Sequence, residues 1–319
     1  MHERLRELTR HDIGQCGFAV SLRDYSWWRI GGSADLLVTP HSIEQVQTLM
    51  REMHRLALPF VVIGGGSNVL FDDAGVRGVV VKIGRHLSRV EINGNAITAE
   101  AGIFVPWLIR QIGRAGLMGL EHAIGIPGTL GGLVLMNGGS MRQNVGSLVD
   151  KVWAVDSEGT LMEFGHDDCR FEYRRSALQT MDIVVVQARL RGEPGEPHSI
   201  RKEMRHILRT RRQKFPLKLP SCGSVFLSDP AMYATVGAPG KIIEQCGFKG
   251  YRVGEAMIPH LHANFIVNLG AARSADVLTI IRQVRKVVQE QTGALLMCEV
   301  RYLAPDCRLM PAHEAEGSV

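Results

Sequence analysis

The sequence predicts an α+β protein, because strands and helices occur in separate runs and not in the strict alternation of a doubly wound sheet. Amphipathic helical stretches lie toward both ends of the chain, and the middle is rich in short apolar strands that include a hairpin. The stretch RGEPGEPHS at residues 191–199 holds two prolines, two glycines and two glutamates. It therefore marks a linker between two parts of the chain.

Composition places the chain among ordinary globular proteins. Of its 319 residues, 45% are hydrophobic and 22% are charged. The net charge of +5 suits anionic ligands, but it is too small and too scattered to indicate nucleic-acid binding. No uncharged apolar run approaches about 18 residues, so no transmembrane span is expected.

Cysteine usage and the N-terminus indicate a cytosolic protein. The six cysteines include no C-x-x-C pair, which is typical of reduced thiols. The sequence MHERLRELTRHDIGQ has no apolar core, so no signal peptide is expected. The HLH at residues 260–262 has no carboxylate or thiol at ligand spacing, so we expect no metal.

Five stretches are expected to be helical, mostly because apolar residues recur three or four positions apart. They lie at residues 42–57, 105–115, 200–213, 240–246 and 275–290. Ser42 is the expected N-cap of the first, with Gln45 completing a capping box. Ser274 is the expected N-cap of the last. The helix at 200–213 is strongly basic.

Short apolar runs between glycines, prolines and polar residues are expected to be strands. They lie at residues 60–63, 78–83, 150–156, 160–164, 183–190, 264–268 and 295–303. A hairpin is expected at 89–102, turning at Asn93-Gly94. Alternation in the last strand places Glu299 on the wetter face, opposite Cys298 and Val300. The polar tail beyond residue 303 is expected to be frayed.

Two glycine-rich loops carry the strongest chemical signal. GGGSN at 64–68 follows a strand, but it lacks the lysine of a P-loop and the spacing of a Rossmann turn. Alone, it is equally well explained as a tight turn. GIPGTLGG at 125–132 adds four glycines and a proline within eight residues. Two such loops are costly in backbone entropy, so we expect a large phosphorylated ligand, dinucleotide-like, to lie against both.

Three separated polar residues are candidates for catalysis, and each also has a plain structural explanation. Arg174 follows Tyr173 in FEYRRS, where a surface ion pair is the simpler interpretation. Ser224 in PSCGSVF does not belong to a G-x-S-x-G elbow and equally suits a turn. Glu299 is equally explained as a solvated carboxylate. Cys222 has no neighbouring histidine that would activate it, so we expect a structural thiol.

The order of these motifs is more specific than any one of them. The motifs are IGG (30–32), GGGSN (64–68), GIPGTLGG (125–132), YRRS (173–176), SCGSVF (221–226) and EVRYL (299–303). Together, from about residue 25 to 303, the chain resembles the UDP-N-acetylenolpyruvoylglucosamine reductases, which complete UDP-N-acetylmuramic acid for peptidoglycan synthesis. The resemblance implies non-covalent FAD in a non-Rossmann fold of the vanillyl-alcohol-oxidase/PCMH type, with NADPH as co-substrate.

The resemblance also implies a domain organisation, with a C-terminal α+β substrate-binding domain after the FAD-binding domain. The expected parts are an N-terminal segment (1–22), the FAD-binding domain (23–192, with two α+β subdomains of about 23–83 and 84–192), the C-terminal domain (193–304) and a tail (305–319). Only about eight residues separate Arg174 from the strand near Ile183. The chain therefore resembles the shorter branch of the family, which lacks the tyrosine lid insert.

The resemblance assigns roles to individual residues. It implies that Arg174, Ser224 and Glu299 are catalytic. Substrate contacts are implied at Tyr173, Lys214, His262 and Asn264. FAD contacts are implied at Gly64, Gly65, Gly66, Ser67, Asn68, Gly125, Ile126, Pro127, Gly128, Thr129, Gly131 and Gly132.

The implied chemistry explains why these residue types are needed. Hydride from flavin N5 reaches the terminal carbon of an enolpyruvyl ether, and negative charge develops on the adjacent carbon and its carboxylate. The planar fork of Arg174 and a protonated Glu299 would stabilise that charge. Ser224 would then protonate the carbon, for which a weak acid is sufficient because the carbanion is strongly basic. NADPH and the UDP-sugar are expected to use one pocket in turn.

Two other functions remain open from the residues alone. Another FAD-dependent sugar or lactone oxidoreductase often links its flavin through a histidine, and none lies in GGGSN or between Gly125 and Arg142. A non-catalytic nucleotide- or RNA-binding module is suggested by the basic helix, which no aromatic stacking platform accompanies. We expect a cytoplasmic bacterial enzyme and a monomer, with no nucleic-acid partner and no membrane insertion.

Overall fold

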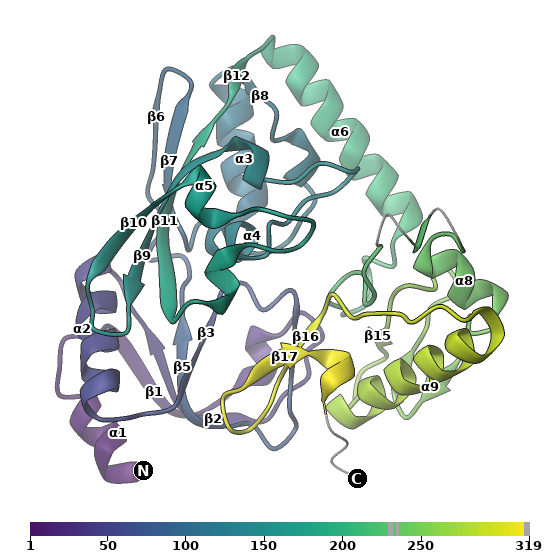
Figure 1. The fold of residues 1–319 in the computed structure, drawn as a ribbon, viewed down its shortest axis with the longest axis horizontal. Coiled ribbons are helices and arrows are strands. Elements are labelled where there is room, and N and C mark those ends of the chain that lie inside the picture. The colour runs from purple at the N-terminus through teal and green to yellow at the C-terminus, as the bar shows by residue number, and fades with distance from the viewer. Residues whose placement is uncertain (229–231, 234–235, 316–319) are drawn as a thin grey trace. The chain divides into compact units, whose positions relative to one another are not determined.

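The computed structural model describes residues 1–228, 232–233 and 236–315 (Figure 1). The chain forms two compact units, each assembled from three stretches. Unit 1 comprises Met1–Phe18, Leu36–Gly65 and Gly78–Arg211, and unit 2 comprises Ala19–Asp35, Gly66–Arg77 and Arg212–Val319. The mixture of helices with mostly antiparallel strands confirms the predicted α+β class. The domain limits proposed from the resemblance stay a prediction.

Helices are distributed over both units. The α-helices of the described residues are α1 (His2–Leu8), α2 (Ile43–Arg55), α3 (Val105–Arg114), α4 (Leu130–Leu135), α5 (His166–Cys169), α6 (Pro197–Lys214), α8 (Pro239–Gln245) and α9 (Ser274–Thr292). Short 3₁₀ helices are η1 (Leu22–Tyr25), η2 (Glu121–Ala123), η3 (Gly146–Leu148), η4 (Ala177–Thr180) and η5 (Ala312–Glu314). In the part of the chain that the structure describes, no helix combines the length and apolarity needed to cross a bilayer.

The longest sheet is antiparallel and belongs to unit 1, in the order β10-β9-β11-β7-β6. Its strands are β6 (Val90–Asn93), β7 (Ala96–Glu100), β9 (Val149–Asp156), β10 (Leu161–Gly165) and β11 (Ile183–Arg191). A second sheet has the order β1-β2-β5-β3, with β1 (Gln15–Ser21), β2 (Ser33–Thr39), β3 (Phe60–Ile63) and β5 (Val76–Lys82). Its β3 and β5 run parallel.

Three small sheets complete the fold. β12 (Glu193–Pro194) pairs with β8 (Leu117–Met118), so the stretch expected to be a linker contributes a short strand to unit 1. In unit 2, β17 (Leu309–Pro311), β16 (Arg301–Leu303) and β4 (Val69–Phe71) form one sheet. The other contains β13 (Arg252–Val253), β14 (Ala256–Met257) and β15 (Val267–Asn268).

Helix ends agree with the sequence in α2 and differ in α9. At α2, the Ser42 hydroxyl accepts a hydrogen bond from the Gln45 N–H at 3.2 Å, as an N-cap should. The prediction that Ser274 caps α9 is wrong, because α9 begins at Ser274 and Arg273 is its N-cap. The Ser274 hydroxyl instead donates to the Asp73 carboxylate at 2.8 Å.

One turn and two strands differ in detail from the predictions. In the β6–β7 hairpin, Asn93 pairs with Ala96, so the turn residues are Gly94 and Asn95 and lie one position later than expected. The strand expected at 264–268 is reduced to β15, and the strand expected at 295–303 is reduced to β16.

The tail beyond residue 303 is packed rather than frayed, as far as the structure describes it. β17 pairs back onto β16, and Ala312 in η5 is buried. The ring of His313 accepts a hydrogen bond from the Cys298 N–H at 3.0 Å. Residues 316–319 of the predicted tail lie outside the described residues.

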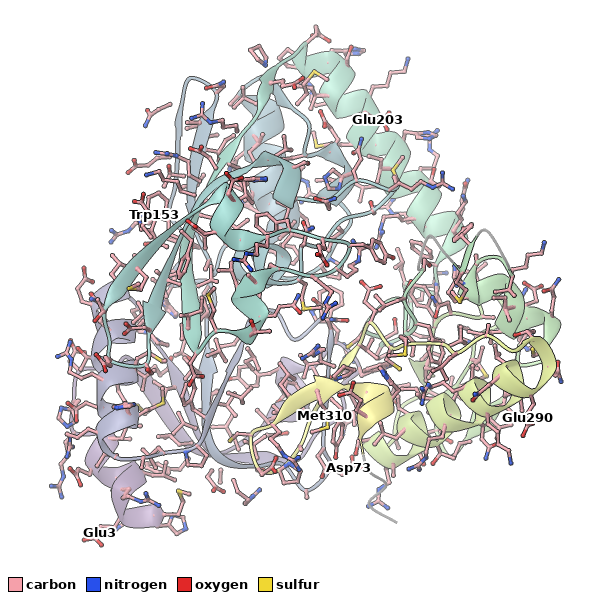
Figure 2. All side chains as sticks on the ribbon, in the orientation of Figure 1. Glu3, Asp73, Trp153, Glu203, Glu290 and Met310 are labelled. Carbon is pink, nitrogen blue, oxygen red and sulfur yellow. The ribbon has the colours of Figure 1, made fainter. Side chains whose placement is uncertain are left out.

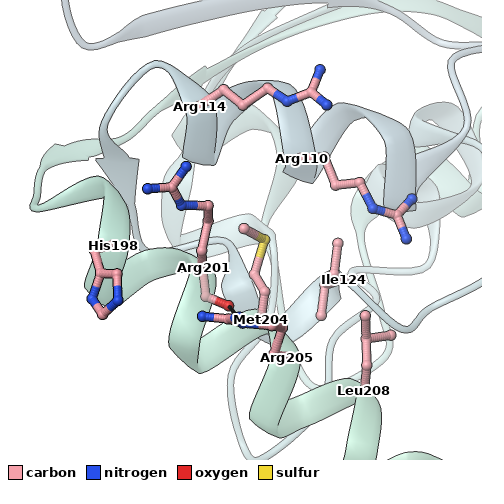
Figure 3. Close-up of a pocket in the computed structure, with 8 residues that line it drawn as sticks. All are labelled: Arg110, Arg114, Ile124, His198, Arg201, Met204, Arg205 and Leu208. Carbon is pink, nitrogen blue, oxygen red and sulfur yellow. Dashed lines mark hydrogen bonds between the residues drawn. The ribbon is translucent and has the colours of Figure 1, made fainter.

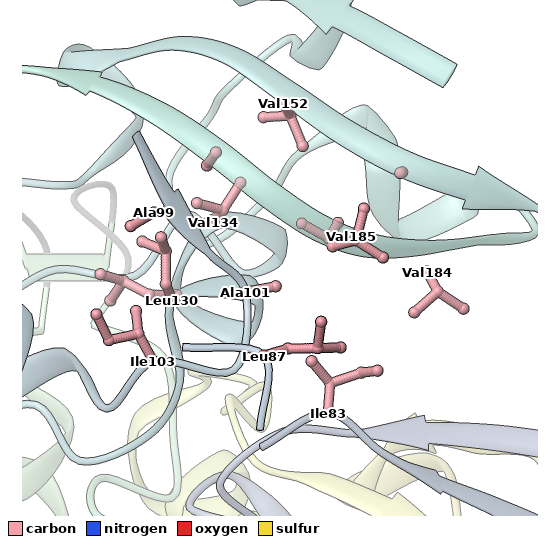
Figure 4. Packing of buried hydrophobic residues seen from close by; sticks show 14 of the residues in the cluster. Ile83, Leu87, Ala99, Ala101, Ile103, Leu130, Val134, Val152, Val184 and Val185 are labelled. Atoms are coloured by element: carbon pink, nitrogen blue, oxygen red, sulfur yellow. The ribbon is translucent and has the colours of Figure 1, made fainter. Parts of the chain in front are cut away.

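Each unit has its own hydrophobic core. In unit 1, Leu130 and Val134 of α4 pack with Ala99 of β7, Val152 of β9 and the neighbouring Ile83 (Figure 4). The unit 2 core contains Trp28 from the N-terminal part together with the apolar stripe of α9. Charged residues lie on the exposed faces of the helices, for example Glu203 on α6 and Glu290 on α9 (Figure 2).

Candidate functional site

The two glycine-rich loops meet backbone to backbone in unit 1. A side-chain carbon on Gly65 would lie 2.7 Å from Cα of Gly128, and one on Gly64 would lie 2.3 Å from the Thr129 hydroxyl oxygen. Real Cβ atoms do not approach other atoms so closely, so only glycine fits at both positions. The loops predicted to hold one phosphorylated ligand are therefore adjacent in space.

The first loop is fixed by the sheet beneath it. Ile63 at the end of β3 lies opposite Lys82 at the end of β5. The Lys82 ammonium donates to the Gly64 carbonyl, and burial lowers the pKa of Lys82 from 10.5 to about 8. Because the C=O and N–H of a trans peptide point in opposite directions, this bond directs the Gly65 N–H away from Lys82.

The second loop ends at the first turn of α4. Thr129 is the N-cap of α4, and its buried hydroxyl has no hydrogen-bond partner among the described residues. A buried hydroxyl without a partner costs about 1–3 kcal/mol, so this oxygen suits a bound ligand. Gly132 is exposed, and a side-chain carbon there would meet only the Thr129 hydroxyl oxygen, at 3.8 Å.

Not every glycine of the second loop is available to a ligand. The Gly131 N–H donates to the Ala101 carbonyl at 2.8 Å, and a side-chain carbon on Gly131 would lie 2.9 Å from Ala101 Cβ. Gly131 therefore serves the packing of α4. The Ile126 N–H donates to the Ala123 carbonyl at 2.9 Å, and the Ile126 side chain packs against the unit 1 core.

A half-buried arginine lies over the start of this loop. The Cδ and Nε atoms of Arg211, near the end of α6, would lie 2.3 and 2.5 Å from a side-chain carbon on Gly125. Burial lowers the pKa of the Arg211 guanidinium. Sequence reasoning had selected Lys214 on the same helix, which is exposed. Arg211 is thus a positive group at the glycine loops that the sequence analysis missed.

Arg174 lies on a strained turn close to the second loop. Its φ is +56°, and its guanidinium donates to the Gly139 carbonyl at 2.6 Å. The guanidinium carbon stands 5.1 Å from the centre of the Tyr173 ring. The adjacent Ser140 hydroxyl donates to the His122 carbonyl at 2.6 Å. These bonds link the Arg174 turn to the segment that leads into Gly125.

His122 is a second residue that the sequence analysis missed. Its side chain is 2% exposed, and neither ring nitrogen has a hydrogen-bond partner among the described residues. Burial, with a smaller effect from the Arg174 charge, lowers the pKa of His122 to about 4, so the ring is neutral near pH 7. In the sequence GLEHAIG, nothing about a histidine next to a glutamate indicates that its ring is buried and neutral.

In unit 2, the Ser224 and Glu299 segments run side by side. The Glu299 N–H donates to the Val225 carbonyl at 2.8 Å, and Val300 shares that acceptor at 3.4 Å. Asn68 joins them, because its side-chain amide donates to the Glu299 carbonyl at 3.1 Å. Three residues predicted from distant motifs therefore converge in this unit.

Asn264 fixes the backbone that carries Ser224. Its side chain accepts from the Phe226 N–H and donates to the Phe226 carbonyl, both at 2.9 Å. Its own carbonyl accepts from the Val225 N–H at 2.9 Å. Gly223, with φ of +79°, has nothing within 4 Å of a side-chain position. Asn264, predicted to contact substrate, thus holds the serine segment in place.

His262 belongs to an aromatic cluster in unit 2. Its ring centre lies 5.4 Å from that of Phe215 and 5.0 Å from that of Phe265. Burial, followed by the positive charge of Lys249, lowers the pKa of His262. This cluster provides an apolar surface that the sequence analysis did not identify.

Cys222 beside the serine has no nucleophilic character. The thiol is buried and close to the Gly66 and Val69 carbonyls, and burial raises the pKa of Cys222 to about 12. All six cysteines are unpaired, in agreement with the sequence analysis.

The predicted site residues thus form two sets. Unit 1 contains Arg174 with the loops at 64–65 and 125–132, and unit 2 contains Asn68, Ser224 and Glu299.

Comparison with known proteins identifies the family. The profile described as "FAD binding domain" matches residues 34–165, and that of the "UDP-N-acetylenolpyruvoylglucosamine reductase, C-terminal domain" matches residues 215–303. UDP-N-acetylenolpyruvoylglucosamine reductase 1 of Corynebacterium glutamicum is 47% identical over 92% of this chain and 88% of its own length. This chain belongs to the UDP-N-acetylenolpyruvoylglucosamine reductase family. The sequence-based recognition and fold class are confirmed.

More distant relatives agree with this assignment. The reductase of Halalkalibacterium halodurans is 37% identical over 95% of this chain and 99% of its own length. The crystal structure of the reductase from Thermus caldophilus is 32% identical, with a TM-score of 0.76, and covers 90% of this chain and 98% of that one. Family membership over the whole length makes this chain an FAD-dependent oxidoreductase.

Proposed function

We propose that this chain reduces UDP-N-acetyl-enolpyruvoylglucosamine to UDP-N-acetylmuramate, using NADPH. Family membership supports the reaction class. The observation that carries the residue assignment is the 2.8 Å hydrogen bond from the Glu299 N–H to the Val225 carbonyl, which sets Glu299 beside the Ser224 segment. We further propose that the enzyme acts as a monomer in the bacterial cytoplasm.

The glycine loops fit the FAD pyrophosphate. Side chains are sterically excluded at Gly64 and Gly65, because these residues abut Thr129 and Gly128 of the other loop. Backbone N–H groups from both loops would therefore be close enough to bind one pyrophosphate. The unsatisfied Thr129 hydroxyl is available to a phosphate oxygen, and Lys82 and Arg211 bring positive charge to the two loops. FAD, when bound, supplies the hydride.

Arg174 is suited to bind the substrate carboxylate. Its guanidinium is oriented by the Gly139 carbonyl and the Tyr173 ring. A planar guanidinium can form two parallel hydrogen bonds to a carboxylate, which positions that group and stabilises the charge that develops there. Removing a preorganised donor of this kind costs about 10²–10³ in rate.

Ser224 is assigned as the proton donor and Glu299 as its partner at the substrate. Asn264 makes three hydrogen bonds to the backbones of Val225 and Phe226, the two residues after Ser224, so the serine adjoins a well-anchored segment. Glu299 would donate a hydrogen bond to the substrate carboxylate, and Ser224 would transfer a proton to the adjacent carbon. Positioned proton transfer contributes about 10²–10⁴ in rate.

The test is Ser224→Ala in the purified holoprotein, with Ser221→Ala as the matched control. The variant should remain yellow, with absorbance near ~450 nm, and NADPH should reduce its flavin at the normal rate. Turnover of the enolpyruvyl sugar should fall at least ~10²-fold, while the control keeps full turnover.

Normal turnover by Ser224→Ala would mean that the proton comes from another group. Loss of flavin from that variant would assign Ser224 a structural role instead. A colourless wild-type protein that does not oxidise NADPH in response to the sugar would overturn the proposed function itself.

A further inference from the structure

A basic cavity in unit 1 belongs to neither the glycine loops nor the predicted catalytic set. It occupies about 550 Å³ between α3 and α6 (Figure 3). Five of its eight lining residues are arginine or histidine, and the other three are apolar; we call the first group the rim and the second the floor. The lining residues are Arg110, Arg114, Ile124, His198, Arg201, Met204, Arg205 and Leu208.

The packing of α3 on α6 creates this cavity. A side-chain carbon on Gly113 would lie 2.9 Å from Met204 Cε and 3.0 Å from Ile200 Cγ2, so glycine allows α6 to approach α3 closely. Arg110 and Arg114 lie four positions apart on α3 and therefore share a face. Figure 3 shows both arginines on α3, with Met204 on the neighbouring α6.

The cavity concentrates positive charge without compensation. The lining residues include no carboxylate, and no described acidic side chain pairs with Arg110, Arg114, Arg201 or Arg205. Arg201 and Arg205 repeat the four-residue spacing on α6, and like charges at that spacing destabilise a helix by about 0.2–0.5 kcal/mol per pair. A bound anion would remove this repulsion.

We propose that the basic cavity binds a nucleoside di- or triphosphate. One guanidinium group can form two parallel hydrogen bonds to the oxygens of a phosphate, so the arginines of the rim suit a di- or triphosphate. Ile124, Met204 and Leu208 offer an apolar floor for the base and ribose. The volume lies within the range of about 300–1,000 Å³ that small-molecule sites occupy.

The shape favours a nucleotide over RNA. The cavity is lined by about one turn of α3, three turns of α6 and Ile124. Its lining contains no phenylalanine, tyrosine or tryptophan on which successive bases could stack. Binding along a strand requires a longer groove with such residues.

Two lining residues connect the basic cavity to the glycine loops. Ile124 directly precedes Gly125, and Leu208 lies three positions before Arg211 on α6. Arg211 covers Gly125. A nucleotide seated against Ile124 and Leu208 is therefore placed to act on the Arg211–Gly125 contact, whichever reaction the enzyme performs.

The test measures binding of ADP, UDP and inorganic pyrophosphate to the holoprotein by calorimetry at low salt. The double variant R114E/R201E removes two rim charges, and R209E makes the same kind of change at an exposed position of α6 outside the lining. We expect ADP or UDP to bind more tightly than pyrophosphate. Binding at the basic cavity should weaken at least tenfold in R114E/R201E and less than twofold in R209E, whereas nucleotide bound at the proposed UDP-sugar pocket should be affected by neither variant.

Each other outcome overturns the proposal. Equal weakening in both variants indicates a general charge effect, and unchanged binding in R114E/R201E places the nucleotide at another site. Pyrophosphate binding as tightly as ADP and UDP removes the role of the apolar floor. An oligonucleotide that binds more tightly than ADP, and is lost in R114E/R201E, would indicate an RNA site.

A measurement on the wild-type protein covers the case in which R114E/R201E does not fold. ADP or UDP should slow amide hydrogen exchange in residues 105–114 and 197–208, which flank the basic cavity. Unchanged exchange in both segments at saturating nucleotide would overturn the proposal.

Discussion

Replacing Gly132 with alanine tests whether glycine is required here by the packing of the protein or by bound FAD. Gly132 is the third residue of α4, it is exposed, and a side-chain carbon would have only the Thr129 hydroxyl oxygen within 4 Å, at 3.8 Å. The protein alone therefore gives no steric reason for glycine. If FAD lies against the loop, the glycine is needed for the cofactor.

The two effects have opposite signs and calculable sizes. Alanine is favoured over glycine in a helix interior by up to about 1 kcal/mol, so the FAD-free protein should melt about 1–4 °C higher. A methyl group pushed into a close-packed contact costs about 1–3 kcal/mol. At 1.4 kcal/mol per tenfold, FAD affinity should fall roughly 5- to 150-fold.

The assay compares thermal unfolding of the FAD-free protein with FAD affinity from recovery of the flavin spectrum. Gly131→Ala is the neighbouring control, because its side-chain carbon would lie 2.9 Å from Ala101 Cβ. That variant should destabilise the FAD-free protein by about 1–3 kcal/mol. Should Gly132→Ala stabilise the protein and leave FAD affinity unchanged, the cofactor does not approach α4.

Three further predictions concern buried groups. Lys82→Met should weaken FAD binding at pH 7, because it removes a positive charge. The FAD affinity of the wild type should fall toward that of the variant as the pH rises through about 8 and Lys82 loses its proton. A variant with wild-type FAD affinity at pH 7 would contradict this prediction. His122 has its pKa lowered to about 4 from 6.5, chiefly by burial, so the unfolded chain binds more protons between these values and stability falls as the pH drops from 6.5 to 4. His122→Phe should remove up to about 3 kcal/mol of that loss, and the exposed His54→Phe should not; equal acid unfolding curves would refute it. Trp28→Phe should lower the free energy of unfolding of unit 2 by about 2–4 kcal/mol, because it leaves a cavity and removes the hydrogen bond to the Ile266 carbonyl. Trp27 is 44% exposed, so Trp27→Phe should lower it by under about 0.5 kcal/mol; urea unfolding measures both values.

Much of the fold was predictable because its long helices obey one strong rule. The helices α2, α3 and α9 bury apolar stripes at helical spacing, as their sequences indicate. Short strands were predictable only in part, since their extent depends on a distant partner. Residues 295–297 have no regular structure, and Cys298 forms only an isolated bridge with Phe226. Glu299 and Val300 form a bend and share one acceptor, and this irregular pairing keeps them out of the regular strand β16.

The candidate site divides in the same way. The juxtaposition of the two glycine loops was predictable, because glycine clusters carry a backbone signal that does not depend on the rest of the fold. The roles of Lys82, His122 and Arg211 were not. A lysine that ends a valine-rich strand looks solvated in sequence, and only the parallel pairing of β3 with β5 brings it beneath the Gly64 carbonyl.

The fully buried Trp28 has a consequence for how the chain is made. Its indole N–H donates to the Ile266 carbonyl at 2.7 Å, and its own carbonyl accepts from the Asn268 side chain at 2.8 Å. At about 5–20 residues per second, those partners leave the ribosome roughly ten to fifty seconds after the tryptophan. During that interval the apolar segment around Trp28 lacks its packing partners and stays exposed. We therefore expect chaperones to bind this segment during synthesis.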